Sequence, residues 1–314
     1  MTHRALITGC DGFVGRHFTT YLKEMDWEVY GLDVASDPTE DAFRYFVDGY
    51  DEWFDLVVHC AYEVGGRAHI DGTNMALAHN VAMDAAMFDW ALKSGQGAVL
   101  YFSSSAAYPV SLQSENAVID EREDGWGDFE ENMRLYEDYI NLDHVHVPDA
   151  NYGWAKLTGE KIAKSASEQG LRVHVVRPFS GYGHDQSLQY PFPSIIKRVK
   201  AGDLTVWGPP GQTRDWIHID DVVAGGFAVY EADERRPVNL CTGVPTEMGD
   251  LAKLISREAH LVDCFTYGGL QDVTYLEDKP TGVFYRVGDP SRLHELYIPT
   301  ITIEEGVREA LRQV

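Results

Sequence analysis

The chain has 314 residues and a formal net charge of −24, and its composition is that of a globular protein, with 44% hydrophobic and 12% aromatic residues. This length suffices for two domains, or for one large α/β unit with an attached lobe. The acidic balance disfavours a broad surface for nucleic acid or for an anionic membrane, because both require clustered Lys and Arg side chains.

The cysteines are scattered and form no CxxC pair, which indicates a reducing compartment and disfavours a disulfide framework. They are Cys10, Cys60, Cys241 and Cys264. His144 and His146 could form a metal pair, but no third ligand accompanies them, so no metal site is predicted. The sequence has no apolar run of membrane-spanning length and no signal peptide, so we expect a cytoplasmic protein.

Short apolar runs alternate with longer amphipathic stretches along the first half of the chain. The runs predicted as strands span residues 4–9, 28–34, 55–62, 97–105 and 172–179, and the helices between them span 15–25, 74–94 and 155–170. Near-continuous apolar strands separated by helices predict a parallel sheet covered on both faces. The βαβαβ order from residue 4 predicts an α/β fold with a Rossmann-type doubly wound parallel sheet.

Two regions depart from this alternation. Residues 111–147 are acidic and weakly periodic, and they stand where an insertion would reach a ligand site, so we hypothesise a lid. After Phe179 the pattern loosens into segments punctuated by Gly and Pro. We therefore predict a Rossmann domain over residues 1–179, with the insertion 111–147, and a smaller lobe over residues 180–314. Segments around 215–242 are expected to return to the Rossmann domain, since "RPVNLCTG" is typical of a further strand of its sheet.

Three glycines, Gly9, Gly12 and Gly15, follow the first predicted strand directly and open a helix. A dinucleotide site needs this combination, because glycine permits a tight turn and close backbone approach to a pyrophosphate at the helix N-terminus. The spacing is GxxGxxG rather than GxGxxG, and a purely structural turn is the alternative. The position directly after an apolar strand favours the dinucleotide site.

Asp33 ends the second predicted strand, where an acid can bind both ribose hydroxyls of the adenosine half of a dinucleotide. No arginine follows within the next few residues to receive a 2′-phosphate, so we predict NAD rather than NADP. Asp48, after the apolar run "FRYFV", is a further candidate for the cofactor through the adenine amine. A loop acid without a ligand is equally compatible with that position.

The fourth predicted strand ends in "YFSSSAAYP", with three consecutive serines. Ligands of open α/β sheets bind beyond the carboxyl ends of the strands, so these hydroxyls would face the crevice. The alternative is a turn with local bonds from side chain to backbone. Downstream, Tyr152 and Lys156 are four residues apart at the start of a predicted helix, so their side chains share one face.

Taken in order, these motifs resemble the extended short-chain dehydrogenase/reductase family, in particular its nucleotide-sugar epimerases, dehydratases and reductases. The shared elements are the glycine loop, "VVHCAY", Asn80, "SSSAAYP", the pair Tyr152 and Lys156, "VRPFSGYG", "QTRDWIHIDDV" and "GDPSRL". The resemblance covers nearly the whole chain. It implies a Rossmann domain that binds NAD, a C-terminal lobe that binds a nucleotide-diphosphate sugar, and a homodimer.

The resemblance also assigns roles to single residues. Tyr152 would be the general base, and Lys156 would favour its phenolate, lower its pKa and bond the nicotinamide ribose. Ser104 would hold the sugar oxygen, with Ser105 as its nearest competitor. The cofactor would also contact Tyr152, together with residues of the glycine loop, of the third strand end and of the following helix: Gly9, Gly12, Phe13, Val14, Gly15, Ala61 and Asn80.

Departures from the family's patterns favour one branch. Dehydratases and decarboxylases of the family carry acids just before the aromatic of the strand-four segment, where this chain has Ser105, Ala106 and Ala107. The 3,5-epimerases and the fucose-synthase-like reductases carry a cysteine at the position of Ala106. We therefore predict an NAD-dependent epimerase that inverts sugar C4 through a transient 4-keto intermediate.

The alternatives rest mainly on the C-terminal lobe. The "KPTGV" segment is more similar to the GDP-sugar branch, which keeps open a GDP-sugar 3,5-epimerase or a reductase that consumes NADP(H). His184, in "GYGHDQ", is then a candidate acid. A non-catalytic, NAD-sensing relative that binds a partner protein is disfavoured by the intact set of Ser104, Tyr152 and Lys156.

The segments "WGPPGQTRDWIHIDD" and "KPTGVFYRVGDPSRLHEL" resemble the diphosphate-binding segments of the family, which implies that Arg214 and Arg286 bind the diphosphate of the substrate. A guanidinium offers bidentate bonds, and an acidic protein needs local cations for an anion. Ser180 is a further candidate substrate contact in the "VRPFSGYG" segment. The alternative for Arg214 is an ion pair with a nearby aspartate of its own segment: Asp215, Asp220 or Asp221.

Overall fold

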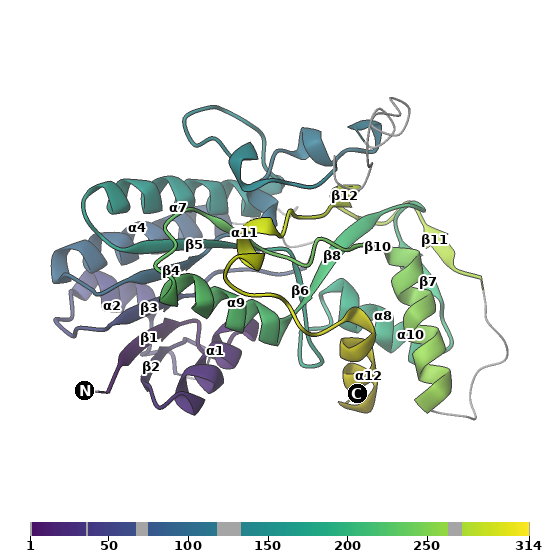
Figure 1. Ribbon diagram of the computed structural model, residues 1–314, viewed down its shortest axis with the longest axis horizontal. Coiled ribbons are helices and arrows are strands. Elements are labelled where there is room, and N and C mark those ends of the chain that lie inside the picture. The colour runs from purple at the N-terminus through teal and green to yellow at the C-terminus, as the bar shows by residue number, and fades with distance from the viewer. Residues whose placement is uncertain (1, 36, 67–74, 118–132, 263–271, 314) are drawn as a thin grey trace.

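The computed structural model describes residues 2–35, 37–66, 75–117, 133–262 and 272–313. Figure 1 shows a layered α/β domain that carries the N-terminus beside a smaller lobe that carries the C-terminus. The central sheet is parallel throughout, in the order β2-β1-β3-β4-β5-β9. Its strands are β1 (Arg4–Thr8), β2 (Glu28–Leu32), β3 (Leu56–His59), β4 (Val99–Phe102), β5 (Val173–Pro178) and β9 (Val238–Leu240). The strand order reverses between β1 and β3, which confirms the doubly wound sheet and sets a ligand crevice at the carboxyl ends of these strands.

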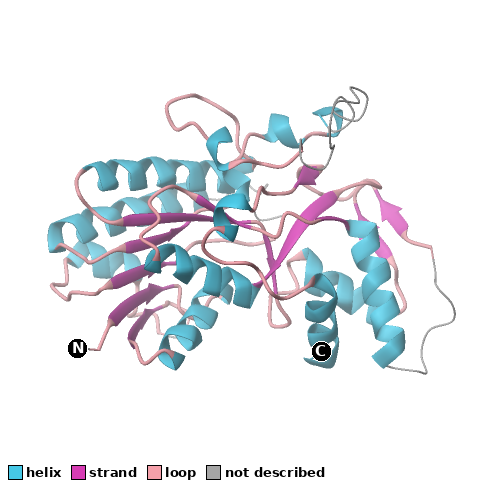
Figure 2. Ribbon diagram, in the orientation of Figure 1, coloured by secondary structure: helices cyan, strands magenta, loops and turns pink. Residues whose placement is uncertain are grey.

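Both faces of the sheet are buried, because successive side chains along a strand point to opposite faces. Leu6 belongs to a core cluster that includes residues of α2, α4 and α7, whereas its neighbours Ala5 and Ile7 belong to a cluster that includes residues of α1 and α9. These helices are α1 (Phe13–Glu24), α2 (Ala42–Asp48), α4 (Ala76–Ser94), α7 (Ala150–Glu168) and α9 (Ile219–Glu231). Figure 2 shows helices on both sides of the strands. Across the described residues, every helix is too short or too polar to traverse a lipid bilayer.

The turn from β1 into α1 depends on glycine. Gly9 has a φ of +68°, and its amide donates to Leu32 O at 2.8 Å. A Cβ on Gly9 would lie 2.8 Å from the backbone nitrogen of Ala61, and a Cβ on Gly15 would lie 2.7 Å from the carbonyl carbon of Gly9. Backbone atoms therefore leave no room for side chains, and strand, helix and neighbouring loop approach as closely as a dinucleotide turn requires.

The lobe has a hydrophobic core of its own, in which Phe192 packs against Tyr182 and Trp216. Strand β8 pairs with β6, β10 and β12, while β7 pairs with β11. The strands are β6 (Ser180–Tyr182), β7 (Thr205–Trp207), β8 (Thr213–His218), β10 (Pro245–Glu247), β11 (Thr274–Leu276) and β12 (Tyr285–Arg286). The helices are α8 (Pro191–Lys200), α10 (Met248–Val262) and α12 (Ile303–Gln313).

After β8 the chain crosses back into the Rossmann layers. Helix α9 packs against α1, β9 pairs with β5, and the short helix α11 (Ser291–His294) lies against β9. Buried Asp215 ties these crossings together, because its carboxylate accepts from the amides of Thr242, Gly243 and Gly288. Helix α9 and strand β9 fall within the segments around 215–242, and the domain boundaries given from the sequence stay a prediction.

The insertion expected at residues 111–147 is described only at its two ends, because residues 118–132 lie outside the described part of the chain. The ends carry the 3-10 helices η2 (Val110–Gln113) and η3 (Glu137–Tyr139). Leu135 forms an isolated parallel bridge with Gly288, and its amide donates to Val287 O at 2.8 Å. The second end therefore packs on the segment after β12, and the lid stays a prediction.

Candidate active site

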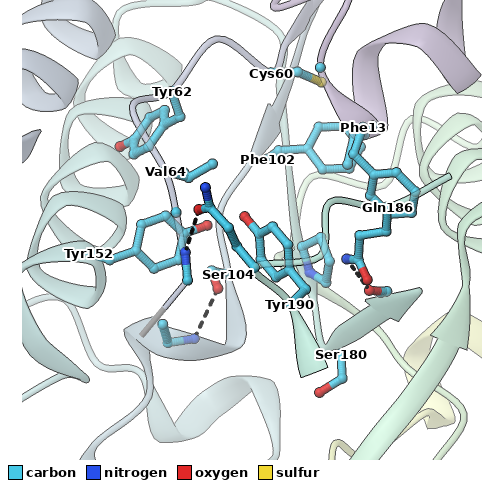
Figure 3. A pocket seen from close by; sticks show the side chains of 18 of the residues that line it. Phe13, Cys60, Tyr62, Val64, Phe102, Ser104, Tyr152, Ser180, Gln186 and Tyr190 are labelled. Atoms are coloured by element: carbon cyan, nitrogen blue, oxygen red, sulfur yellow. Dashed lines mark hydrogen bonds between the residues drawn. The ribbon is translucent and has the colours of Figure 1, made fainter. Parts of the chain in front are cut away.

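A large cavity lies between the carboxyl edge of the sheet and the lobe. Its volume is about 1380 Å³, and it is lined by the β1–α1 turn, by the ends of β2 to β5 and by residues of the lobe. A typical site for one small molecule has ~300–1,000 Å³, so this cavity has room for two ligands. Figure 3 shows part of its wall, with Tyr152 and Ser104 from the Rossmann domain and Tyr190 and Ser180 from the lobe.

The glycine turn lines this cavity. The residues that line it are Gly9, Gly12, Phe13, Val14 and Gly15, all predicted to contact the cofactor. Asp33 lines it as well, where its carboxylate accepts from the amides of Asp11 at 3.0 Å and Ala35 at 2.9 Å. These bonds fix the carboxylate at the end of β2, which is where this type of fold binds a ribose diol.

Asp48 is not among the residues that line the cavity. The run "FRYFV" belongs to α2, and Asp48 is exposed at the end of this helix. Asp41 caps the other end, where its carboxylate accepts from the Phe43 amide at 2.9 Å, and both Glu40 and Asp41 line the cavity. An aspartate directly before a helix is a cap signal, and this signal would have indicated Asp41. The apolar run alone led to Asp48, at the C-terminal end of the same helix.

Ala61 and Asn80 shape the wall that follows β3, and both line the cavity. Asn80 is buried on α4, where its side-chain oxygen accepts from the Glu63 amide at 2.7 Å. Its side-chain nitrogen donates to Glu63 O at 3.0 Å. One amide side chain thus satisfies both backbone groups of Glu63 and fixes the loop beside the glycine turn.

The predicted catalytic side chains lie together in the cavity. Ser104 follows β4 and caps the 3-10 helix η1 (Ser105–Ala107), accepting from the Ala106 amide at 3.1 Å. Tyr152 and Lys156 lie on the first turns of α7, and both line the cavity with Ser104. Ser105, the competitor of Ser104, also lines it but is only 4% exposed. The geometry therefore favours Ser104 as the hydroxyl that meets a ligand.

Burial dominates the electrostatics of Tyr152. Desolvation raises the pKa of its phenol well above the usual value, the neighbouring Tyr190 phenol raises it further, and a hydrogen bond with Ser104 only partly offsets this. The Lys156 ammonium lies 5.9 Å from the centroid of the Tyr152 ring. Desolvation thus acts against the depression of the Tyr152 pKa that the sequence predicts from Lys156. The phenol is protonated at neutral pH.

Lys156 is buried as well, and its ammonium donates to Phe102 O at 2.6 Å. Desolvation lowers the pKa of Lys156 to about 8, and buried Asp84 is the foremost of the groups that act to raise it. At neutral pH the amine is therefore still cationic, but the pH lies only about one unit below its pKa. The sequence signalled the Tyr152–Lys156 pair by its spacing, but not Tyr190, which precedes α8 and also lines the cavity.

Both predicted phosphate-binding arginines line the lobe side of the cavity. Arg214 on β8 and Arg286 on β12 are direct partners in the register of these strands, so their side chains leave the same face. Arg286 donates to Gln113 Oε1 at 2.5 Å and to Asp149 Oδ2 at 2.9 Å. Arg214 donates to the carbonyl of Val283 at 2.7 Å. Paired guanidinium groups on one face suit a diphosphate.

The aspartates proposed as alternative partners of Arg214 all bind other groups. Asp215 accepts from backbone amides as described above, Asp220 lies 3.4 Å from His17, and Asp221 accepts from the Tyr297 hydroxyl at 2.6 Å. Ser180 begins β6 and lines the cavity (Figure 3).

The histidines considered as acid or metal ligands lie elsewhere. His184 is not among the cavity-lining residues and pairs with Glu309 of α12 at 3.0 Å. His144 is exposed in an irregular loop, and His146 Nε2 lies 3.1 Å from Ala107 O.

One group of possible metal ligands occurs among the described residues, at the glycine turn itself. Ligand atoms of Cys10, Asp11 and Asp33 all lie within 4.8 Å of one another. Burial and the neighbouring carboxylates raise the pKa of the Cys10 thiol to about 11.

Two enzymes that act on nucleotide sugars are similar to this chain over most of its length. GDP-mannose 3,5-epimerase 1 from Oryza sativa subsp. japonica is 25% identical over 333 residues, which cover 97% of this chain and 80% of that protein. The dTDP-4-dehydro-6-deoxy-D-allose reductase from Streptomyces bikiniensis is 24% identical over 325 residues, covering 93% of this chain and 89% of the relative.

The fold is shared with solved structures. UDP-N-acetylglucosamine 4-epimerase from Methanobrevibacter ruminantium M1, in complex with UDP-N-acetylmuramic acid, has a TM-score of 0.78 at 20% identity, covering 99% of this chain and 98% of that one. A model of the NAD dependent epimerase/dehydratase family matches residues 5–241. Because this match takes in most of the chain, including the glycine turn and the Tyr152–Lys156 pair, the protein belongs to the NAD dependent epimerase/dehydratase family, within the extended short-chain dehydrogenases/reductases.

Proposed function

We propose that the protein is an NAD-dependent nucleotide-sugar epimerase that inverts the configuration at C4 of the sugar. The observation that carries this proposal is the convergence of Ser104, Tyr152 and Lys156 in one cavity with the glycine turn and the paired arginines. The similarity to a solved UDP-N-acetylglucosamine 4-epimerase supports the same reaction class.

The residues of the glycine turn fit a dinucleotide. Side chains at Gly9 and Gly15 would collide with backbone, and Gly12 has no side chain to cap α1, which leaves the first amides of the helix for a pyrophosphate. Asp33 is placed for the adenosine ribose, and its carboxylate disfavours a 2′-phosphate there. When bound, NAD supplies the carbon that takes up hydride from the sugar and gives it back.

The chain's own residues manage the proton and the position of the sugar. Tyr152 takes the proton from the reacting hydroxyl during oxidation and returns a proton during reduction. Ser104 shares that oxygen, and the cation of Lys156 favours the phenolate. Because burial raises the pKa of Tyr152, the phenolate is the minority form at neutral pH, and turnover should rise with pH until Lys156 loses its charge.

Inversion requires the ketone to present both faces to the same hydride carbon. Arg214 and Arg286 are suited to hold the diphosphate while the sugar turns, because two guanidinium groups from neighbouring strands give an anchor that does not depend on the pose of the sugar. With the diphosphate held in place, the reacting sugar carbon can stay aligned with the hydride carbon in both orientations of the sugar.

A second candidate is a GDP-sugar 3,5-epimerase or a nucleotide-sugar reductase. Pro280, Thr281 and Gly282 of the "KPTGV" segment line the cavity, which keeps that segment within reach of a substrate. The relatives named above include one protein of each kind. Against this candidate, Ala106 offers only a methyl group where those branches are expected to carry a cysteine.

The experiment is to incubate purified protein with UDP-, GDP-, dTDP- and CDP-sugars without added cofactor. Formation of the C4 epimer with no net change in the absorbance of reduced nicotinamide supports the proposal. Turnover only with stoichiometric NAD(P)H supports a reductase, and solvent hydrogen appearing at C3 or C5 supports a 3,5-epimerase. Heat-released nucleotide from the purified protein, identified by mass, tests NAD as the resident cofactor.

The proposal includes a homodimer in a cytoplasmic setting. Among the described residues Cys10, Cys60 and Cys241 are free thiols, in keeping with a reducing compartment. Light scattering coupled to size-exclusion chromatography tests the dimer, and a monomer at micromolar concentration would remove that part of the proposal.

A further inference from the structure

A buried hydrogen-bond network lies behind the catalytic pair. Asp84 on α4 is 0% exposed and accepts from the hydroxyls of Tyr62 and Tyr101, each at 2.7 Å. It also contacts His59 Nε2 at 3.2 Å. A carboxylate held by three donors away from water is fixed in place, and its charge is screened less than that of a surface acid.

The bonds of this network are compatible with a single direction of donation that ends at Asp84. The Ala61 amide donates to Thr8 Oγ1 at 3.2 Å, and Thr8 Oγ1 lies 2.8 Å from His59 Nδ1. With the Thr8 hydroxyl donating to Nδ1, His59 carries its proton on Nε2 and donates it to Asp84. Every bond then has one donor and one acceptor, and Asp84 is the acceptor at the end.

Tyr62 connects this carboxylate to Lys156. The Lys156 Nζ lies 3.1 Å from the centroid of the Tyr62 ring, within reach of a cation–π attraction. Because Asp84 binds the Tyr62 hydroxyl, the ring cannot turn away from the ammonium without losing that bond. Tyr62 also lines the cavity and meets the Tyr152 ring edge-on, with centroids 6.2 Å apart (Figure 3).

The other titratable groups around Lys156 leave Asp84 as its main counter-charge. Burial raises the pKa of Cys60 to about 12, so this thiol is neutral. Glu160 faces the lysine from α7, but Arg177 binds both of its oxygens, at 2.9 and 2.7 Å, and compensates its charge. Burial also raises the pKa values of the surrounding phenols, which are therefore neutral: Tyr62, Tyr101 and Tyr152.

We propose that Tyr62 and Asp84 are positioning residues for Lys156. The Tyr62 ring holds the ammonium beside Tyr152, and Asp84 both anchors the ring and supplies the charge that keeps the lysine cationic. A neutral amine could not favour the Tyr152 phenolate. The inference rests on the proposed function only for the task that it gives to Lys156.

The test compares Asp84→Asn and Tyr62→Leu with the wild type. Asp89→Asn is the matched control, since Asp89 is an exposed acid on the same helix, paired with Lys93 at 2.6 Å. The titration of Lys156 is followed by carbon-13 NMR of protein labelled at the lysine ε-carbons, and its resonance is identified by its loss in Lys156→Met. The pH dependence of nucleotide-sugar turnover is measured in parallel.

In the wild type the lysine should titrate near pH 8, and the alkaline limb of turnover should fall at the same pH. Asp84→Asn should move both midpoints down by about one pH unit, since an opposite charge nearby is worth ~1–3 units. Above the midpoint this is about a tenfold loss of charged lysine. Tyr62→Leu should move both midpoints in the same direction, because it removes the ring face that attracts the ammonium. Asp89→Asn should leave both midpoints unchanged.

A Lys156 midpoint in Asp84→Asn equal to that in Asp89→Asn would overturn the inference. Should Asp84→Asn not fold, a Tyr62→Leu variant that titrates like the wild type would overturn it equally. The NMR titration of Lys156 is measured without substrate. The positioning role of Tyr62 and Asp84 can therefore be tested separately from the proposed epimerase activity. A shifted titration in a protein that turns over no nucleotide sugar rejects only the epimerase, and an unshifted one in an active epimerase rejects only the positioning role.

Discussion

Replacing Lys156 with methionine should stabilise the folded protein while abolishing its turnover. The side chain is 3% exposed, and burial lowers its pKa from 10.5 to about 8. At about 1.4 kcal/mol per unit, keeping the ammonium charged inside the protein costs about 3 kcal/mol at neutral pH. Methionine avoids that cost but forfeits the bond to Phe102 O and the cation–π attraction to the Tyr62 ring, each worth about 1 kcal/mol. The expected net gain is about 1 kcal/mol.

The pH dependence separates this explanation from improved packing. Between pH 8 and 10.5 the unfolded chain holds the Lys156 proton more tightly than the folded one, so wild-type stability rises with pH across that window. The advantage of Lys156→Met is therefore complete below pH 8 and shrinks above it. At pH about 9.5, about 1.4 of the 3 kcal/mol remains, and the stability of Lys156→Met relative to the wild type should have fallen by about 2 kcal/mol.

Urea denaturation of the wild type and of Lys156→Met, at pH 7 and at pH about 9.5, measures the difference in their free energies of unfolding. Titratable groups that both proteins share contribute equally and cancel in this difference. Lys161→Met is the control, because Lys161 lies on the same helix with its side chain 51% exposed. Lys161→Met should be no more stable than the wild type at pH 7, and its stability relative to the wild type should not change at high pH. A Lys156→Met protein less stable than the wild type at pH 7, or one with the same advantage at both pH values, would refute the reasoning.

Three further substitutions test the site. Tyr152→Phe should lower kcat by about 10²–10⁴-fold with NAD affinity retained; an undiminished kcat would remove Tyr152 as the base. Gly15→Ala should abolish NAD binding in a calorimetric titration and lower Tm, because the new Cβ would lie 2.7 Å from the Gly9 carbonyl carbon. Arg286→Lys should raise the KM for the nucleotide sugar by about 10–100-fold at unchanged kcat, since lysine cannot bond two oxygens side by side. An unchanged KM would place the diphosphate elsewhere.

The order of elements was predictable because it depends on local patterns. The five apolar runs predicted as strands up to residue 179 all lie in the sheet, and "RPVNLCTG" supplies its edge. The glycine turn and the Tyr152–Lys156 pair were predictable for the same reason, since fixed spacing on a turn or helix decides which groups share a face. The sequence thus located one wall of the cavity with its main chemistry.

What the sequence could not supply is contact between distant segments. Tyr62 follows a strand and Asp84 lies mid-helix, and neither pattern indicates that both meet Lys156 behind the cavity. Spacing likewise reveals a neighbouring cation but not the loss of water around Tyr152, which raises the pKa of its phenol. Asp48 was predicted from the apolar run "FRYFV", which forms helix α2 with Phe46 buried in the same core cluster as residues of α4.

Strand β9 is the edge of the main sheet, yet in the chain it stands between β8 and β10 of the lobe. Neither half of the protein is therefore a continuous piece that can be excised. A fragment ending at Phe179 would lack α9 and β9 and would expose the apolar face that includes Phe18, Leu100 and Val176. Grafting a foreign lobe to alter substrate preference would need several junctions instead of one. The two halves are accordingly expected to melt as a single calorimetric transition.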